Sequence, residues 1–246
     1  MKKRTNAMVA IVAMVGVGLI AAYGPGAPAG AAPHPGVAQA AVDPADFTTP
    51  VQNPYFPLER GTVSILRGSE DGKRLLNRTT ITPWSKMIQG VSTTVVNDVL
   101  YEGGALREKT TDWYAPDNSG NVWYFGEATA VYNNKGQVVN TEGSWEAGVN
   151  GAIAGIIMTA NPGPTDAYRQ EFLKGHAEDQ GWIVARHQVA HVPYGKVDQV
   201  VRSYEWTRLE PGVVSLKLYG PGLGIIREKD VAGGTELLEL IKVEHH

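Results

Sequence analysis

The stretch TDWYAPDNSGNVWYFGE, residues 111–127, decides the fold predicted for this chain. Its centre, residues 117–120 (Asp-Asn-Ser-Gly), is a turn signal, because Asp and Asn side chains bond their own backbone and Gly accepts a positive φ. The flanking aromatic and β-branched residues suit a pleated, half-buried surface. The stretch therefore predicts a β-hairpin with five aromatic residues and three carboxylates around one turn.

The register of this hairpin determines which side chains share a face. If the loop is residues 117–120, Tyr114 lies opposite Trp123. Two residues further from the turn on each strand, Asp112 lies opposite Phe125. Successive strand residues point to opposite faces, so one face should present Asp112, Tyr114, Trp123, Phe125 and Glu127. Asp112 and Glu127 would then be diagonal neighbours, roughly 7–8 Å apart at Cα.

Two carboxyl groups on an aromatic face suggest a binding or catalytic site. Burying them ionised is costly unless they are paired, hydrogen-bonded or bound to a cation. Asp112 and Glu127 are therefore candidate catalytic residues, because burial can raise a carboxyl pKa into the range of a general acid. The alternative is that both lie at the rim of the sheet and cap loop amides. The candidate ligand-binding residues are Tyr114, Trp123, Phe125, Glu142, Trp145 and Glu171.

The turn itself offers oxygen atoms to a divalent cation. Asp117 and Asn121 could bind calcium, which prefers oxygen ligands. Their spacing departs from the EF-hand pattern, and a simple turn is the competing interpretation.

The N-terminus has the pattern of an export signal. Basic residues at positions 2–4 precede an apolar run and small-residue cleavage sites, so residues 1–40 are predicted to be a signal peptide and leader. Residues 41–52 are expected to be a flexible linker, and residues 53–244 a single β domain. The chain has no Cys, so we expect neither disulfides nor a lipid anchor on an N-terminal Cys. We expect a secreted protein without stable membrane insertion after signal cleavage.

Composition and motifs narrow the classes of function. The net charge is −3 with mixed signs along the chain, so nucleic acid is not an expected partner. No G-x-S-x-G elbow, phosphate-binding loop or dinucleotide-binding motif is present. Short strand-like runs alternate with Gly-rich turns, such as Asp71-Gly72 and 220–222. This pattern predicts an all-β protein whose single antiparallel meander forms a barrel or a strongly curved sheet.

Several segments also resemble known bacterial proteins. The segments FPLERGT (56–62), 111–127, GSWEAGVNGAIAGIIM (143–158), VPYGKVDQVVRSYEW (192–206) and YGPGLGIIRE (219–228) resemble a group of exported bacterial β-rich proteins. The resemblance covers nearly all of residues 54–240. The closing part also looks like the end of bacterial lipoproteins whose curved antiparallel sheets hold lipids.

These observations leave three classes of function. The first is a secreted binding protein that holds a small molecule or a cation, such as calcium, in an aromatic pocket bearing carboxylates. The second is a secreted hydrolase or lyase that uses Asp112 or Glu127 as a general acid or base, with Glu142 or Glu171 as partner. The third is a cell-surface interaction domain without a small-molecule site.

Overall fold

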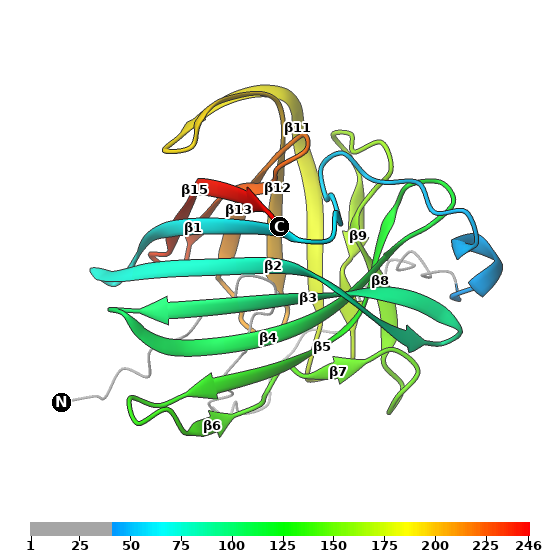
Figure 1. Cartoon of the computed structure of the whole chain (residues 1–246), viewed down its shortest axis with the longest axis horizontal. Coiled ribbons are helices and arrows are strands. Elements are labelled where there is room, and N and C mark those ends of the chain that lie inside the picture. The colour runs from blue at the N-terminus through cyan, green and yellow to red at the C-terminus, as the bar shows by residue number, and fades with distance from the viewer. Residues whose placement is uncertain (1–40) are drawn as a thin grey trace, which may run out of the picture.

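The computed structural model describes residues 41–246 and consists almost entirely of β-strands (Figure 1). One short 3-10 helix, η1 (Pro44–Phe47), precedes them. The strands are β1 (Thr62–Glu70), β2 (Lys73–Ile88), β3 (Val91–Glu102), β4 (Ala105–Pro116), β5 (Val122–Tyr132), β6 (Val138–Asn140), β7 (Trp145–Glu146), β8 (Ile153–Met158), β9 (Ala167–Arg169), β10 (Glu171–Phe172), β11 (Asp179–Val192), β12 (Gly195–Thr207), β13 (Val214–Gly220), β14 (Gly224–Ala232) and β15 (Leu237–His245).

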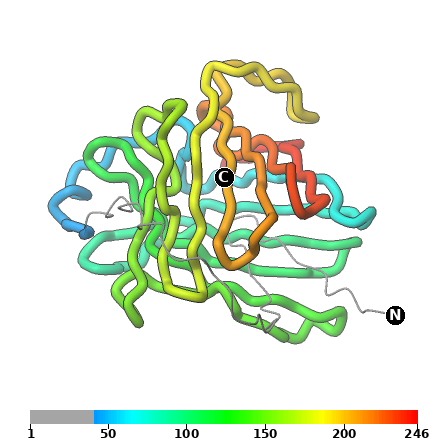
Figure 2. The backbone as a smooth tube through the Cα atoms, turned by 180° about the vertical axis from the view of Figure 1, so that it is seen from behind, coloured from blue at the N-terminus to red at the C-terminus, as the bar shows by residue number. Residues whose placement is uncertain are grey.

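The strands form one antiparallel sheet, which confirms the predicted all-β class. Its order is β10-β8-β5-β4-β3-β2-β1-β15-β14-β13-β12-β11-β9, with β6 and β7 added to β5. Most neighbours in this order are consecutive in the chain, as in a meander. The last strand, β15, pairs with the first, β1, so the sheet curls round on itself. Figure 1 shows β1 to β5 as the front wall, and Figure 2 shows the opposite wall, formed by β8 to β13.

A short segment between β8 and β11 brings the two ends of the sheet together. β9 pairs with β11, and β10, two residues further on, pairs with β8. Gly155 on β8 allows this close approach, because a Cβ there would lie 2.1 Å from the carbonyl oxygen of Gln170. The sheet is therefore nearly closed into a barrel, and its interior is shielded from water.

Local sequence explains the hairpins. Asp71 and Gly72, between β1 and β2, both have positive φ, 46° and 75°, as the type I′ turn of a two-residue hairpin requires. Along β3 the residues at alternate positions Val96, Asp98 and Leu100 are buried, as expected for a strand with one face toward a core. The apolar positions form two clusters, one around Tyr114 and Tyr124 and one around Leu238 and Leu240.

The β11–β12 hairpin extends beyond the rest of the wall. In Figures 1 and 2 it curves over the strands near the C-terminus, above β15. Register shifts along β11, between Ile183 and Ala190, accompany this bend. The backbone N–H of Tyr194, at the tip, donates to the carbonyl of Leu240 on β15 at 2.9 Å. The hairpin is thus held against the barrel and does not stand free.

The segment before β1 makes ordered contacts with the barrel. Residues 41–52, assigned to a linker from sequence, include η1, whose Phe47 ring packs edge-on against Trp123 and Phe125. The N–H of Val51 also donates to the carbonyl of Asp117 at 3.0 Å. The predicted signal peptide and leader, residues 1–40, lie outside the described residues. Within residues 41–246, no helix has the length and apolar character needed to cross a membrane.

Candidate functional site

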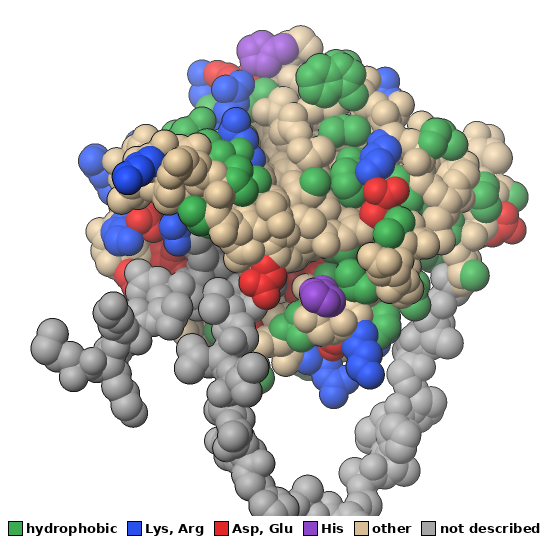
Figure 3. Space-filling view, turned by 90° about the horizontal axis from the view of Figure 1, so that it is seen from below, with side chains coloured by type: hydrophobic (Ala, Val, Ile, Leu, Met, Phe, Trp, Pro, Cys, Tyr) green, Lys and Arg blue, Asp and Glu red, His purple; other side chains and the backbone are tan. Residues whose placement is uncertain are grey.

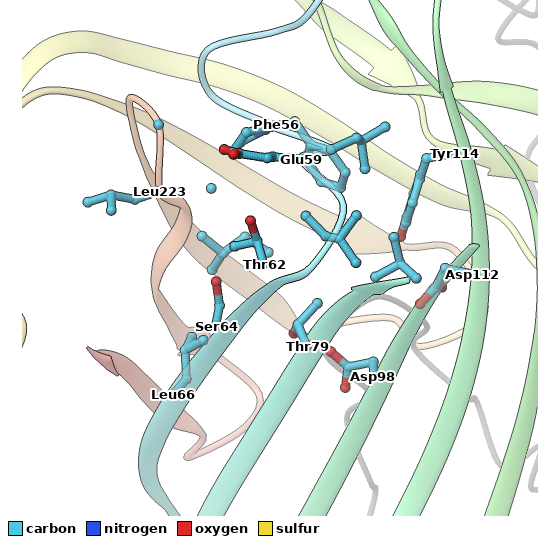
Figure 4. Close-up of a pocket in the computed structure, with 17 residues that line it drawn as sticks. Phe56, Glu59, Thr62, Ser64, Leu66, Thr79, Asp98, Asp112, Tyr114 and Leu223 are labelled. Atoms are coloured by element: carbon cyan, nitrogen blue, oxygen red, sulfur yellow. Dashed lines mark hydrogen bonds between the residues drawn. The ribbon is translucent and has the colours of Figure 1, made fainter. Parts of the chain in front are cut away.

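A cavity of about 90 Å³ opens at one end of the barrel, between β1–β4 and the segment before β1 (Figure 4). Its walls are mainly apolar and include Phe56, Leu58, Ile81, Val96 and Ile225. Three carboxyl residues interrupt this lining, with Glu59 at the mouth and Asp98 and Asp112 deeper on β3 and β4. The arrangement suits a ligand with an apolar body and one polar end.

Asp112 is positioned by its strand and by an aromatic cluster. It shares a face of β4 with Tyr114, and the Tyr114 ring stacks on that of Tyr124 with centroids 4.7 Å apart. Tyr124 Oη donates to Asp112 Oδ1 at 2.7 Å. Asp112 Oδ2 is buried and makes no well-aligned hydrogen bond within residues 41–246, although the Tyr114 hydroxyl lies close enough to lower the pKa of Asp112. One carboxyl oxygen is therefore held in place by Tyr124 while the other is only weakly engaged.

Asp98 is fully engaged by its neighbours. Asn77 donates to Oδ1, and Thr79 donates to Oδ2 at 2.7 Å. Burial raises the pKa of Asp98 to about 6, against the lowering effect of these hydrogen bonds and of Lys217. Asp98 therefore still carries most of its negative charge at pH 7, close to the unpaired oxygen of Asp112.

The carboxyl groups of Asp112, Glu127 and Glu171 are buried together. Burial is the main reason that their pKa values lie well above the ordinary range. Mutual repulsion adds to this, because the charge of Glu171 raises the pKa of Glu127 and that of Asp98 raises the pKa of Asp112. Glu127 Oε1 lacks a hydrogen-bond partner within residues 41–246, and the Trp145 side chain lies close enough to Glu171 to lower its pKa slightly against the effect of burial. Burial and mutual repulsion therefore both favour the protonated, neutral form of these groups.

A buried lysine balances part of this acidity. Lys217 Nζ lies 2.9 Å from Glu205 Oε2 and 3.5 Å from Glu228 Oε1. Burial alone would raise the pKa of Glu205, but Lys217 and the hydrogen bond from Tyr219 hold it below its ordinary value. Lys217 is the one buried lysine or arginine in the described part of the chain, whereas the buried Asp and Glu side chains are Asp98, Glu108, Asp112, Asp117, Glu127, Glu171, Asp179, Glu205, Glu228, Asp230 and Glu236. The barrel interior is therefore strongly acidic in composition.

The predicted register of the central hairpin was wrong. Tyr114 pairs with Tyr124 and not with Trp123, and Asp112 pairs directly with Glu127. One residue of the shift arises at the turn, because Pro116 pairs with Val122 and not with Asn121, and a bulge at Phe125 on β5, opposite Trp113 and Tyr114, adds a second. Gly126 has φ 136°, and a Cβ there would lie 2.3 Å from the carbonyl oxygen of Trp145. The bulge lets β7 approach closely and places the two acids opposite each other.

The changed register also moves two aromatic residues away from the predicted pocket. Trp123 and Phe125 pack against Phe47, and neither lines the cavity. Trp145 is buried with its ring edge-on to Tyr124, centroids 5.3 Å apart. It therefore supports the aromatic cluster behind Asp112.

The predicted acidic partners behave differently from each other. Glu142 is exposed and exchanges hydrogen bonds with Asn140 in the turn before β7, so its assignment to the pocket was wrong. Glu171 is 2% exposed and belongs to the buried acids. It reaches them from β10, the strand that closes the barrel.

The oxygen atoms proposed for calcium close the turn. Asp117 Oδ1 accepts from the N–H groups of Ser119 and Asn121, and Oδ2 accepts from Asn121 Nδ2 and Trp123 Nε1. Asn121 Oδ1 accepts from the N–H of Ala160. Among residues 41–246, no group of three or more His, Asp or Glu side chains is arranged to hold a metal ion. The competing interpretation, a simple turn, fits these contacts.

Sequence reasoning missed Asp98, Phe56 and Tyr124. A signal for Asp98 was available, because it alternates with Val96 and Leu100 at core-facing positions of one strand. Tyr124 was placed on the wrong face by the register error. Phe56 comes from the segment before β1, and nothing local in its sequence indicates which end of the barrel that segment covers.

The fold and this site define an all-β barrel with an acidic interior and a mainly apolar opening. No protein-family model and no curated protein matches the chain. Its structure is similar to that of a candidate exported protein of YmcC-like fold from Bacteroides fragilis, with a TM-score of 0.46, 14% identity, and coverage of 77% of this chain and 98% of that one. It is also similar to a candidate lipoprotein from Parabacteroides distasonis, with a TM-score of 0.42, 12% identity, and coverage of 79% and 100%.

Proposed function

We propose that this chain is an exported binding protein that holds a small amphipathic molecule in the mouth of its barrel. The apolar body of the ligand packs between Phe56 and Ile225, and a cationic or hydrogen-bond-donating head group binds Asp112. The observation that carries the proposal is the unpartnered, buried Oδ2 of Asp112 in a cavity whose other walls are mainly apolar. An unsatisfied buried oxygen is costly, and a ligand donor would remove that cost.

Electrostatics favours a protonated amine as this head group. Asp98, with a pKa of about 6, supplies negative charge beside Asp112, and Glu59 adds a carboxylate at the mouth. An ammonium group bound there would lower the pKa of Asp112, so binding would release a proton. The affinity for an amine should therefore rise with pH as Asp98, whose pKa is about 6, and Asp112 ionise.

An acid–base enzyme has less support. Asp112 and Glu127 are directly paired, as such a mechanism would favour. However, Glu127 does not line the cavity, so a substrate there would meet only one of the two carboxyl groups. The binding function is therefore the better account of the geometry.

The test compares ligands that share a chain and differ in head group. Hexylamine, hexanol and hexanoate are titrated into the mature protein, with binding followed by NMR chemical shifts. We expect hexylamine to bind most tightly and Asp112→Asn to weaken it by about tenfold, the worth of one charge-assisted hydrogen bond. Glu142→Gln, which removes an exposed carboxylate, is the control and should have no effect. Equal binding of hexanoate, or unchanged binding of hexylamine by Asp112→Asn, would refute the proposal.

A further inference from the structure

A second hollow lies on the outside of the barrel, away from the acidic interior. It is an open groove of about 520 Å³ between the outer face of β1–β3 and the tip of the β11–β12 hairpin. Arg67 on β1 and Arg74 and Leu76 on β2 line it, together with Tyr101 on β3 and Pro193 in the hairpin turn. None of these residues belongs to the cavity at the barrel mouth.

The strand register places the two arginines side by side. Arg67 pairs with Leu76, and Arg74 lies two residues before Leu76 on the same strand. The two arginines are therefore diagonal neighbours on one face, about 7–8 Å apart at Cα. Tyr101 pairs with Leu76 from the other side, so an aromatic ring and an aliphatic side chain adjoin the two guanidinium groups.

The one acidic residue in the groove already has a partner. Glu239 Oε1 accepts from Arg227 Nε at 2.8 Å, so its charge is neutralised by a base on β14. Arg67 and Arg74 form no ion pair or side-chain hydrogen bond within residues 41–246. Glu239 also lies opposite Arg67 in the β1–β15 register, but two arginines and one glutamate leave the groove with a net positive charge, although the chain as a whole carries a net charge of −3.

The hairpin that forms the roof is fixed in place. Arg227 Nη2 donates to the carbonyl of His191 at 2.7 Å, and the N–H of Tyr194 donates to the carbonyl of Leu240. These two contacts lie on either side of Pro193. The groove is thus bounded by ordered backbone on both walls, and a ligand would not have to order the hairpin first.

We propose that this groove is a second binding site, for a molecule that carries an anionic oxygen group on a flat, partly apolar body. Guanidinium groups bind carboxylate and phosphate oxygens in pairs, which two adjacent arginines can extend to one doubly charged group. Tyr101, Leu76 and Pro193 then contact the body of the ligand. On the face shown in Figure 3, Lys and Arg side chains are interspersed with Asp and Glu side chains. The distribution of charge over this face therefore does not by itself indicate a binding site. The groove is identified by its shape and by its two arginines without ion-pair partners.

The experiment uses the mature chain with phenyl phosphate, benzoate and inorganic phosphate as probes, titrated by NMR at low ionic strength. We expect phenyl phosphate to bind more tightly than inorganic phosphate and to shift signals of Tyr101 and of the 192–195 turn. The double substitution Arg67→Gln/Arg74→Gln should weaken phenyl phosphate by about tenfold or more. Comparison of phenyl phosphate with benzoate identifies whether phosphate or carboxylate is the preferred group.

The control is Lys135→Gln. Lys135 is exposed in the turn between β5 and β6 and is not part of the groove lining. The substitution removes one positive charge and should leave binding unchanged. The proposal is overturned if neither aromatic anion binds, if inorganic phosphate binds as tightly as phenyl phosphate, or if Lys135→Gln weakens binding as much as the double substitution.

Discussion

Replacing Lys217 with Met should destabilise the barrel more than any change at an exposed ion pair. Lys217 is 6% exposed and lies within 3.5 Å of two buried glutamates, and it is the cation that lowers the pKa of Glu205. Met keeps most of the aliphatic stem, so the main effect is the loss of charge. Removing one partner of a buried ion pair typically costs about 3–5 kcal/mol, a large part of the stability of a single domain.

The cost should depend on pH. Without Lys217, the folded-state pKa of Glu205 rises above its unfolded value, so the folded state holds a proton that the unfolded state releases. Such a group favours folding below the unfolded pKa, and this contribution is lost as pH rises through the folded pKa. The Met variant should therefore be closer to wild type at pH 5 than at pH 8.

The assay is urea unfolding of wild type and variant at both pH values, followed by Trp fluorescence. Lys73→Met is the control, because the Lys73–Glu102 pair is exposed and should contribute at most about 1 kcal/mol. Glu205→Gln added to Lys217→Met should recover part of the loss by removing the unpaired charge. The reasoning is refuted if Lys217→Met costs no more than Lys73→Met at pH 8, or if its cost is the same at pH 5.

Two further predictions follow from the buried acids and from the bulge. Burial raises the pKa of Glu108 and of Glu228 to about 8, and each folded value lies above the unfolded one, so wild-type stability should fall as pH rises from 5 to 8. Thermal unfolding checks this, and a Tm that rises over the same range would contradict it. Gly126→Ala should destabilise the protein by about 1–3 kcal/mol, because the Cβ would meet the carbonyl of Trp145 at a strained φ. Gly136→Ala, at a positive φ with open space around it, should cost less in the same denaturation assay.

The sequence was informative about strands and turns. Asp71-Gly72 and the turn at 117–120 were correctly predicted, because their backbone conformations depend on the residues within each turn. The alternation of buried and exposed positions gave the all-β class for the same reason. The register of the central hairpin was not predicted: the strands pair from Pro116 and Val122, one residue later than expected, and a bulge beside Gly126, where β7 approaches from about twenty residues further along the chain, adds a second shift.

The sequence by itself determined that this chain forms an antiparallel meander, because turn chemistry and strand alternation act over a few residues. The tertiary structure decided which charged groups meet, since Asp98 on β3 is near Lys217 on β13, and Asp112 on β4 is near Glu171 on β10, only when the sheet curls round. It also decided that Asp112 faces a cavity and that Arg67 and Arg74 lie beneath a hairpin more than a hundred residues away. The physical reason is closure of the barrel, because it brings the inward-facing side chains of strands that are distant in sequence into one interior.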